Sequence, residues 1–369
     1  MSQPPQEASS KGTVLVTGAN GYIAGQVILT LLSSGYAVRG TVRSLSRSKR
    51  LLDSDSPFYA HAASGRFELV EVPDITAAGA FDAALSGGCS STALTSIVHL
   101  AQPVVLDSTD AQYLCDVAVQ GTLNLVSAAA TLSEQQQHHQ QRRLKSFVFM
   151  SSIAAIAAGH HRSSEVITAD MWSDLDVRAA GLRARGRAVP GPLAYGASKT
   201  AAERALWRFR AERAPRFAVA AVHPGLVAGP AAGGQADVRT SGGFVYAILA
   251  GGDLPPREAL LGHGAHVDVR DVARLTAFAV EHPHRTDGRR LLAASSYVTP
   301  LAVAKVLREA YPERRGVIKG EGEGVRDDFA FPEEGPKYDT QTVVELTGQD
   351  WIPFKKTLLD AAKAYEVLL

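Results

Sequence analysis

The sequence has little cysteine, no long hydrophobic run and no excess of either charge. Its 369 residues include two cysteines, Cys89 and Cys115, which excludes a disulfide scaffold or a cysteine-rich zinc module and favours a reducing compartment. No run reaches the roughly 18 apolar residues that a membrane helix needs. Lysine plus arginine number 38 and aspartate plus glutamate 37, so neither a nucleic acid nor a membrane is expected as the main partner.

The N-terminal segment predicts no targeting signal, and the histidines predict no metal site. Residues 1–11 are polar and lack the apolar core of a signal peptide, so we predict a disordered N-terminus and a cytoplasmic protein. The eleven histidines include adjacent pairs in predicted loops, and no carboxylate or cysteine set completes a site with them. No bound metal is therefore expected.

Short aliphatic runs alternate with helical patterns through the first 230 residues. Predicted strands cover 13–17, 36–42, 67–72, 96–101, 147–151 and 218–222, with helices at 21–32, 77–85, 108–132 and 195–213. This alternation predicts an α/β fold, a doubly wound parallel Rossmann sheet covered on both faces. We expect residues 12–230 to form this domain, with a long loop at 160–192. Residues 231–369 should form a smaller mixed α/β substrate lobe that can be interleaved with it.

A glycine-containing turn joins the first predicted strand to the first helix. In the stretch 18–24, Gly18 permits a tight turn and Gly21 lets the backbone approach a pyrophosphate. The small Ala24 allows close packing of the helix on the sheet. The position of this turn, between a strand and a helix near the N-terminus, indicates a dinucleotide site.

The end of the second predicted strand favours NADP over NAD. NAD enzymes usually place a carboxylate there to bind the ribose 2′-hydroxyl. Here Arg43 and then Arg47 follow the strand, and no carboxylate appears before Asp53. A guanidinium group can bind a 2′-phosphate through two hydrogen bonds, so Arg43 is the first candidate and Arg47 the second.

A tyrosine, a lysine and a serine suggest the reaction chemistry. Tyr195 and Lys199 are four residues apart and share one helix face. A nearby ammonium lowers the pKa of a phenol and makes it a usable proton donor. Ser152, with Ser151 as the alternative, ends a predicted strand at the sheet edge where ligands bind, and its hydroxyl can bond a carbonyl oxygen.

Together these motifs resemble the extended short-chain dehydrogenases/reductases. The resemblance spans nearly all of the first 230 residues in the expected order, and Val267–Ala273 extends it into the C-terminal part. It is similar above all to NADPH-dependent ketone and aldehyde reductases of the dihydroflavonol reductase and methylglyoxal reductase type. The motifs are Thr17-Gly18-x-x-Gly21-x-x-Ala24, Asp74-Ile75, His99-Leu100-Ala101, Gly121-Thr122-x-Asn124, Ser151-Ser152, Tyr195-x-x-x-Lys199 and His223-Pro224-Gly225.

The resemblance implies a role for each matching residue. Tyr195 would protonate the alkoxide, Lys199 would lower the Tyr195 pKa and bind the nicotinamide ribose, and Ser152 would orient the carbonyl. NADP(H) would be the cofactor, and a ketone or aldehyde would be reduced to an alcohol. The implied cofactor-binding residues are Gly18, Asn20, Gly21, Tyr22, Ile23, Arg43, Arg47, Asp74, Ile75, Leu100, Ala101, Gln102, Tyr195, Lys199, Pro224, Gly225 and Val227.

The substrate and two other functions stay open. Small apolar side chains near the site favour a hydrophobic small-molecule carbonyl, and the predicted pocket residues are Val104, Ile153, Trp172, Ala228 and Phe244. A sugar-nucleotide epimerase or dehydratase would share the scaffold, but such enzymes usually hold NAD, which Arg43 disfavours. A non-enzymatic NADP-sensing protein would tend to lose Tyr195 or Lys199, and both are present. The resemblance to the short-chain dehydrogenases/reductases also implies a monomer or a homodimer.

Overall fold

The computed structural model describes residues 11–87, 89, 92–104, 110–136, 143–157, 166–232, 241–254, 264–320, 325–333 and 337–369. The predicted disordered N-terminus lies outside these residues, except for Lys11.

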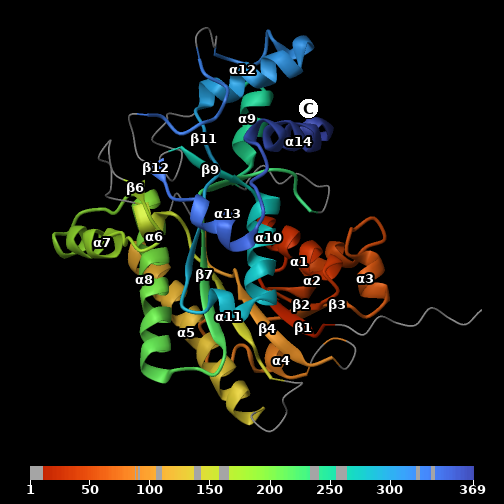
Figure 1. Cartoon of the computed structure of the whole chain (residues 1–369), viewed down its shortest axis with the longest axis vertical. Coiled ribbons are helices and arrows are strands. Elements are labelled where there is room, and N and C mark those ends of the chain that lie inside the picture. Colours follow the sequence, from red (N-terminus) through yellow and green to blue (C-terminus); the bar gives the residue numbers. More distant parts are fainter. Residues whose placement is uncertain are drawn as a thin grey trace, which may run out of the picture.

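Within the described residues, seven parallel strands form the central sheet (Figure 1). Their order is β10-β7-β5-β4-β1-β2-β3, and every neighbouring pair is parallel. The order reverses between β1 and β4, and ligands of open α/β sheets bind at such a switch point. The prediction of a doubly wound α/β fold is confirmed. The strands are β1 (Thr13–Thr17), β2 (Ala37–Val42), β3 (Phe67–Glu71), β4 (Leu94–His99), β5 (Ser146–Met150), β7 (Ala218–Pro224) and β10 (Arg290–Ala293).

The strands are apolar throughout because both faces of the sheet are covered. Val14 and Val16 of β1 belong to one core cluster, whereas Leu15 belongs to the other. The first core lies under α1 (Tyr22–Ser33) and α10 (Val269–Glu281), and the second under α5 (Ala111–Gln135) and α8 (Gly191–Arg213). Alternate side chains of a strand point to opposite faces, so each strand contributes to both cores.

The C-terminal third builds a lobe and also returns to the main sheet. Its apolar core lies mainly among three helices, drawn at the top of Figure 1. In the sequence, α10 and β10 lie between elements of this lobe. In space, α10 packs on α1, and β10 forms the edge strand of the main sheet beside β7. The lobe and connecting elements are β8 (Leu226–Ala228), α9 (Gly243–Leu249), β9 (Ala265–Asp268), α11 (Pro283–Thr286), β11 (Ser296–Tyr297), α12 (Pro300–Ala310), β12 (Lys337–Tyr338), α13 (Gln341–Thr347) and α14 (Phe354–Tyr365).

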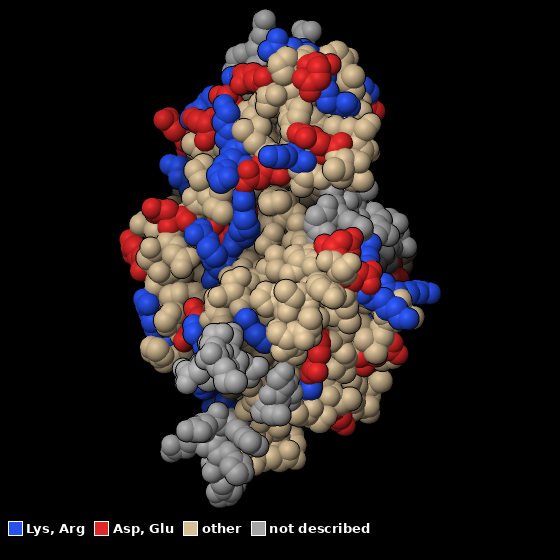
Figure 2. Space-filling model, turned by 90° about the vertical axis from the view of Figure 1, so that its right-hand side faces the viewer, with Lys and Arg blue, Asp and Glu red and all other residues tan. Residues whose placement is uncertain are grey.

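Charges of both signs occur on the face of the molecule shown in Figure 2. On the face shown in Figure 2, blue and red side chains both gather on the upper part, and tan atoms predominate in the middle. This agrees with the formal net charge of +1. Among the described helices, none combines the length and the apolar character that crossing a membrane requires.

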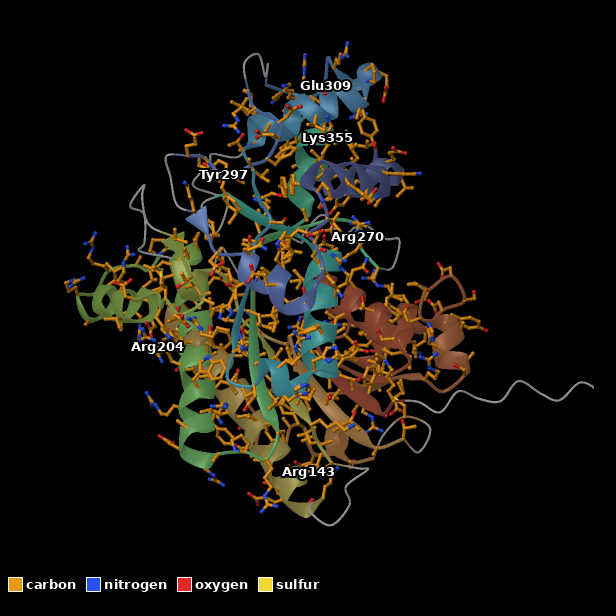
Figure 3. All side chains as sticks on the ribbon, in the orientation of Figure 1. Arg143, Arg204, Arg270, Tyr297, Glu309 and Lys355 are labelled. Atoms are coloured by element: carbon orange, nitrogen blue, oxygen red, sulfur yellow. The ribbon has the colours of Figure 1, made fainter. Side chains whose placement is uncertain are left out.

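The segment 160–192 contains regular structure where a long loop was predicted. It includes β6 (Val166–Ile167) and α7 (Leu175–Ala184), and α8 already begins at Gly191. Leu175 packs over Gly196, where an added Cβ would lie 2.2 Å from Leu175 Cδ1. Arg204 of α8, labelled in Figure 3, pairs with Asp176 of α7 at 3.4 Å. Arginines interrupt the apolar residues of this segment and hide their helical spacing in the sequence. The spacing becomes recognisable only when α7 is seen packed on α8. The remaining short helices are α2 (Leu45–Ser48), α3 (Tyr59–Ala63), α4 (Asp82–Leu85) and α6 (Ala154–Ala157).

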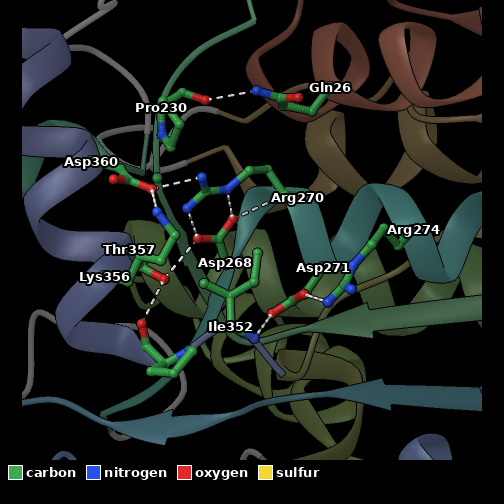
Figure 4. A network of polar contacts seen from close by, with 12 residues as sticks. Gln26, Pro230, Asp268, Arg270, Asp271, Arg274, Ile352, Lys356, Thr357 and Asp360 are labelled. Carbon is green, nitrogen blue, oxygen red and sulfur yellow. Dashed lines mark hydrogen bonds and ion pairs between the residues drawn. The ribbon is translucent and has the colours of Figure 1, made fainter. Parts of the chain in front are cut away.

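A buried aspartate connects the lobe to the main sheet (Figure 4). Asp268 Oδ2 accepts hydrogen bonds from Arg270 Nη2 and from Thr357 Oγ1, each at 2.7 Å. Arg270 Nη1 also donates to Asp360 at 2.7 Å. Because Thr357 and Asp360 lie on α14, this network fixes the C-terminal helix to the N-terminus of α10.

Gly40 allows the phosphate-turn segment to approach β2, and this contact can be tested. An added Cβ at Gly40 would lie 2.6 Å from Ala19 Cβ and 3.1 Å from Leu69 Cδ2. We expect Gly40→Ala to lower the free energy of unfolding by about 1–3 kcal/mol, measured by denaturant titration, because overpacking a core strains it. Gly316→Ala, which adds its Cβ where no atom lies within 4 Å, should change stability by less than about 0.5 kcal/mol. Equal effects would contradict this interpretation.

Candidate active site

The turn after β1 has the geometry of a pyrophosphate site. Gly18 has a φ of +71°, and an added Cβ would lie 3.3 Å from the Ala101 Cα atom. The Gly21 N–H donates to the Gly18 carbonyl at 2.9 Å, and no described side chain caps α1. The first N–H groups of α1 and the positive end of its dipole therefore point out of the turn together. A dinucleotide pyrophosphate fits this arrangement.

A cavity of about 160 Å³ adjoins this turn. Asn20, Gly21 and Tyr22 of the predicted cofactor set line it, together with Arg50, which lies outside that set. The Tyr22 hydroxyl donates to the Gly229 carbonyl at 2.7 Å, and burial raises the pKa of Tyr22 well above its ordinary value. Tyr22 therefore acts here as a neutral structural group.

A single hydroxyl organises the loop after β4. Thr17 Oγ1 accepts hydrogen bonds from the N–H groups of Leu100 at 3.0 Å and Ala101 at 2.9 Å, and it lies 2.9 Å from His99 Nδ1. Because both acceptor positions of the hydroxyl are occupied, its proton goes to Nδ1, and His99 carries its own proton on Nε2. Burial, with the Lys199 charge, lowers the pKa of His99 to about 3, so the ring is neutral.

The chain after β2 presents its arginines to solvent. Arg43 and Arg47 are exposed, and neither forms an ion pair with a residue that the structure describes. Glu71 ends the neighbouring strand β3, and its carboxylate accepts a hydrogen bond from the Leu45 N–H at 2.7 Å. The nearby acidic group is thus engaged by the backbone, which leaves both guanidinium groups available to an anion.

The predicted adenine-flanking segment is held from α5. Asn124 Nδ2 donates to the carbonyls of Ile75 at 2.9 Å and Ala77 at 3.1 Å. Gly121 leaves room for Ile75, because an added Cβ would lie 2.5 Å from Ile75 Cδ1. Asp74 accepts hydrogen bonds from the N–H and hydroxyl of Thr76. Gly121 and Asn124, which sequence reasoning noted only as a motif, thus support the segment on which Asp74 and Ile75 lie.

The three predicted catalytic side chains come together at the end of β5. A hydrogen bond joins Ser152 to the Tyr195 hydroxyl. Lys199 Nζ donates to the Met150 carbonyl at 3.1 Å and lies 5.9 Å from the centre of the Tyr195 ring. The Ser151 hydroxyl instead donates to Glu203 at 2.5 Å, so the alternative serine is engaged elsewhere.

Burial controls the charges of this cluster. It raises the pKa of Tyr195 above its ordinary value despite the Ser152 hydrogen bond, so the phenol is protonated at neutral pH. The predicted lowering of the Tyr195 pKa is therefore wrong for this structure, because desolvation outweighs the Ser152 hydrogen bond. Burial also lowers the pKa of Lys199 to about 8, although the Glu203 charge acts in the opposite direction. A protonated phenol next to a cation that titrates near neutrality is suited to acid–base chemistry.

Four more of the predicted cofactor residues have defined neighbours in the structure. The Pro224 carbonyl accepts a hydrogen bond from the Ile153 N–H at 2.9 Å, so the ends of β5 and β7 are joined. Gly225 lies close to the lobe, because an added Cβ would be 2.5 Å from the Ala265 carbonyl oxygen. Val227 pairs with Val267 between β8 and β9, and Gln102 Nε2 contacts Thr122 Oγ1 at 3.5 Å.

The predicted substrate residues occupy different surroundings. Ile153 and Ala228 are buried, and Val104 is exposed. Phe244 packs edge-on against His266, with 5.5 Å between ring centres, and the Arg290 guanidinium lies 3.9 Å from the centre of the Trp172 ring. Neither this 160 Å³ cavity nor a second one of about 430 Å³ beside α14 is lined by these five side chains. The substrate pocket therefore stays a prediction.

Within the described ranges, no three His, Cys, Asp or Glu side chains gather in a way that could hold a metal ion.

The sheet order, the uncapped glycine turn and the Ser152–Tyr195–Lys199 cluster define a dinucleotide-binding α/β protein with oxidoreductase-type side chains. Residues 14–174 and 187–294 match the model of the NAD dependent epimerase/dehydratase family, and the chain belongs to this family. The resemblance to extended short-chain dehydrogenases/reductases is thereby confirmed.

Several relatives are reductases. The chain is 33% identical to ketoreductase adrE of Penicillium roqueforti, covering 81% of this chain and 80% of that protein. It is 28% identical to aldehyde reductase 2 of Sporidiobolus salmonicolor, covering 90% and 89%. The solved structure of yeast methylglyoxal/isovaleraldehyde reductase Gre2, complexed with NADPH, aligns with a TM-score of 0.78 at 25% identity over 96% of this chain and 98% of Gre2. The NADPH in that complex agrees with the cofactor prediction.

The Thr17 hydroxyl gives a test of how the cofactor loop is supported. Thr17→Val keeps the shape of the side chain but leaves the Leu100 and Ala101 N–H groups and His99 without this partner. We expect the free energy of unfolding to fall by about 1–3 kcal/mol and NADPH affinity, measured by fluorescence titration, to fall with it. Thr17→Ser, which keeps the hydroxyl, should remain closer to the native protein in both measurements. Equal losses in the two variants would show that the hydroxyl is unimportant.

Proposed function

We propose that the protein reduces a small ketone or aldehyde to an alcohol with NADPH, and that Tyr195 is the proton donor. The observation that carries this proposal is the meeting of Ser152, Tyr195 and Lys199 at the carboxyl end of β5. Reductases and ketoreductases among the relatives support the reaction class. The family model carries the name of the epimerase or dehydratase alternative, but the exposed Arg43 favours a phosphorylated coenzyme over the NAD that such enzymes usually hold.

The side chains have distinct tasks in this proposal. When bound, NADPH supplies the hydride for the carbonyl carbon. The Ser152 hydroxyl orients the carbonyl oxygen, and the protonated Tyr195 phenol gives its proton to that oxygen. Lys199 uses one of its three N–H groups in the hydrogen bond to the Met150 carbonyl. The other two can form hydrogen bonds to hydroxyl groups of a ligand. Its positive charge stabilises the negative charge that develops on the phenol oxygen.

The compartment and assembly belong to the same proposal. We expect a cytoplasmic enzyme, monomeric or homodimeric, that acts on a hydrophobic small-molecule carbonyl. The unpaired thiols of Cys89 and Cys115 suit a reducing compartment. Size-exclusion chromatography with light scattering would decide between the two assemblies.

Removing the phenol hydroxyl tests the proton donor. Tyr195→Phe should lower kcat by about 10²–10⁴-fold, as expected for loss of a general acid, and should leave NADPH affinity within about twofold. The assay is the loss of nicotinamide absorbance with a panel of aldehydes and ketones that includes methylglyoxal and isovaleraldehyde. Tyr113→Phe, at an exposed tyrosine of α5, should be as active as the native protein. Undiminished turnover in Tyr195→Phe would refute the assignment.

Reversing the charge at Arg43 tests the choice of coenzyme. Arg43→Glu should raise the dissociation constant for NADPH by about tenfold or more, because a charge-assisted hydrogen bond is lost and a repulsion is added. NADH, which lacks the 2′-phosphate, should bind nearly as before. Arg208→Glu, at an exposed position on α8, should change neither affinity. Equal weakening for NADPH and NADH would show that Arg43 does not contact the 2′-phosphate.

A further inference from the structure

A buried carboxylate lies one helical turn beyond Lys199. Glu203 is fully buried on α8, and its two oxygens accept hydrogen bonds from four side chains. Ser151 Oγ lies at 2.5 Å and His223 Nε2 at 2.7 Å from Oε2. Trp207 Nε1 lies at 2.9 Å and Arg290 Nε at 2.7 Å from Oε1. These donors lie directly after β5 and on β7, β10 and α8, so one side chain joins the ends of three strands of the sheet to the helix that carries Tyr195 and Lys199.

Three successive turns of α8 face three successive residues at the end of β5. Tyr195 bonds Ser152, Lys199 bonds the Met150 carbonyl, and Glu203 accepts from Ser151. Residues spaced by four share one helix face. Glu203 thus belongs to the same side of α8 as the two proposed reaction residues.

This buried region holds more positive than negative side chains. Lys199 and Arg290 are cationic, whereas Glu203 is an anion that pairs with Arg290 at 2.7 Å and whose charge acts on Lys199 one helical turn away. Burial alone would raise the pKa of Glu203, but the hydrogen bonds from His223 and Arg290 and the guanidinium charge hold it well below its ordinary value. Burial lowers the pKa of His223, so the neutral ring donates its Nε2 proton. The other titratable groups that face Lys199 are Tyr195 of α8 and His99 of β4, both uncharged at neutral pH.

The network also reaches the segment before α7. Arg290 Nη1 donates to the carbonyl of Ala169 at 2.6 Å and to that of Met171, and its guanidinium stacks on Trp172. Glu203 and Arg290 therefore hold residues 169–172 against the sheet. The Trp172 ring is therefore engaged by the Arg290 guanidinium, 3.9 Å from its centre.

We propose that Glu203 is a positioning residue of the reaction, whose negative charge keeps the Lys199 side chain cationic and whose hydrogen bonds fix the end of β5. The inference rests on the proposed function of Lys199 and extends it to a residue that does not touch the reacting atoms. Replacing a buried ion pair by apolar groups is often neutral or favourable for stability. A merely stabilising role would not require a charge at this position, whereas an ammonium that must stay protonated does.

The pH profile tests the charge. Lys199 acts as an ammonium, so kcat/KM of the native protein should fall as pH rises through about 8. Glu203→Gln keeps the size of the side chain and removes its charge, so protonated Lys199 becomes less favourable. The falling limb should move to lower pH by about one unit or more. Glu203→Asp, which keeps the charge but shortens the side chain, should lower kcat with little shift of that limb. Glu212→Gln, at an exposed position on the same helix, should match the native protein.

A second measurement does not depend on catalysis. In protein labelled with ¹³C at the lysine ε-carbon, the Lys199 signal, assigned by its loss in Lys199→Met, reports the ammonium titration directly. It should move to lower pH in Glu203→Gln and stay near the native value in Glu203→Asp and Glu212→Gln. An unchanged titration in Glu203→Gln, or an equal shift in Glu203→Asp, would overturn the inference. If Glu203→Gln does not fold, a shift of a full unit in Glu203→Asp overturns it alone. If the native protein reduces no carbonyl, the proposed function fails, and the Lys199 titration still decides the role of Glu203.

Discussion

A lysine ammonium group buried at the end of a parallel strand is the constraint on which the rest of the site depends. Lys199 is 4% exposed, and a charge removed from water is costly unless hydrogen bonds and an opposite charge compensate for it. The Met150 carbonyl and the Glu203 carboxylate supply both. They lie in place because β5 ends there and α8 crosses it, with Leu175 of α7 packed over Gly196 beside Tyr195. The packing of α7 and α8 therefore determines whether the Lys199 ammonium keeps these two partners.

Sequence reasoning succeeded where the signal is local. A parallel strand buried on both faces is a short apolar run, and such a run can be recognised without knowing its neighbours. The predicted bounds of β1 agree with the structure, and those of β5 differ by one residue. The glycine turn at Gly18 and Gly21 and the pair Tyr195 and Lys199 are likewise contained within seven residues or fewer. The fold class and the centre of the site follow from features of this kind.

Reasoning from the sequence failed where the partner is distant. Arg290 lies 87 residues after Glu203, and His99 lies 82 residues after Thr17, so no spacing rule connects them. The helix α7 was missed because its apolar residues acquire meaning only against the small Gly196. The direction of the Tyr195 pKa was wrong for a related reason. The neighbouring lysine is visible in the sequence, but the extent of desolvation depends on the packed structure.

Two buried carboxylates, Asp268 and Glu203, make similar contacts but have different functions. Asp268 and Glu203 each bind an arginine and a hydroxyl, from Thr357 and Ser151 respectively. The Arg270 side chain is 27% exposed and is shared with Asp360, so its charge is balanced locally. The Arg290 side chain is 9% exposed, and its one carboxylate partner among the described residues is Glu203, which also faces Lys199. Two buried cations thus depend on one anion at the site, whereas the lobe network pairs two cations, Arg270 and Lys356, with two anions, Asp268 and Asp360. Loss of charge at Asp268 should loosen the lobe, but loss of charge at Glu203 changes the protonation of a side chain that the reaction uses.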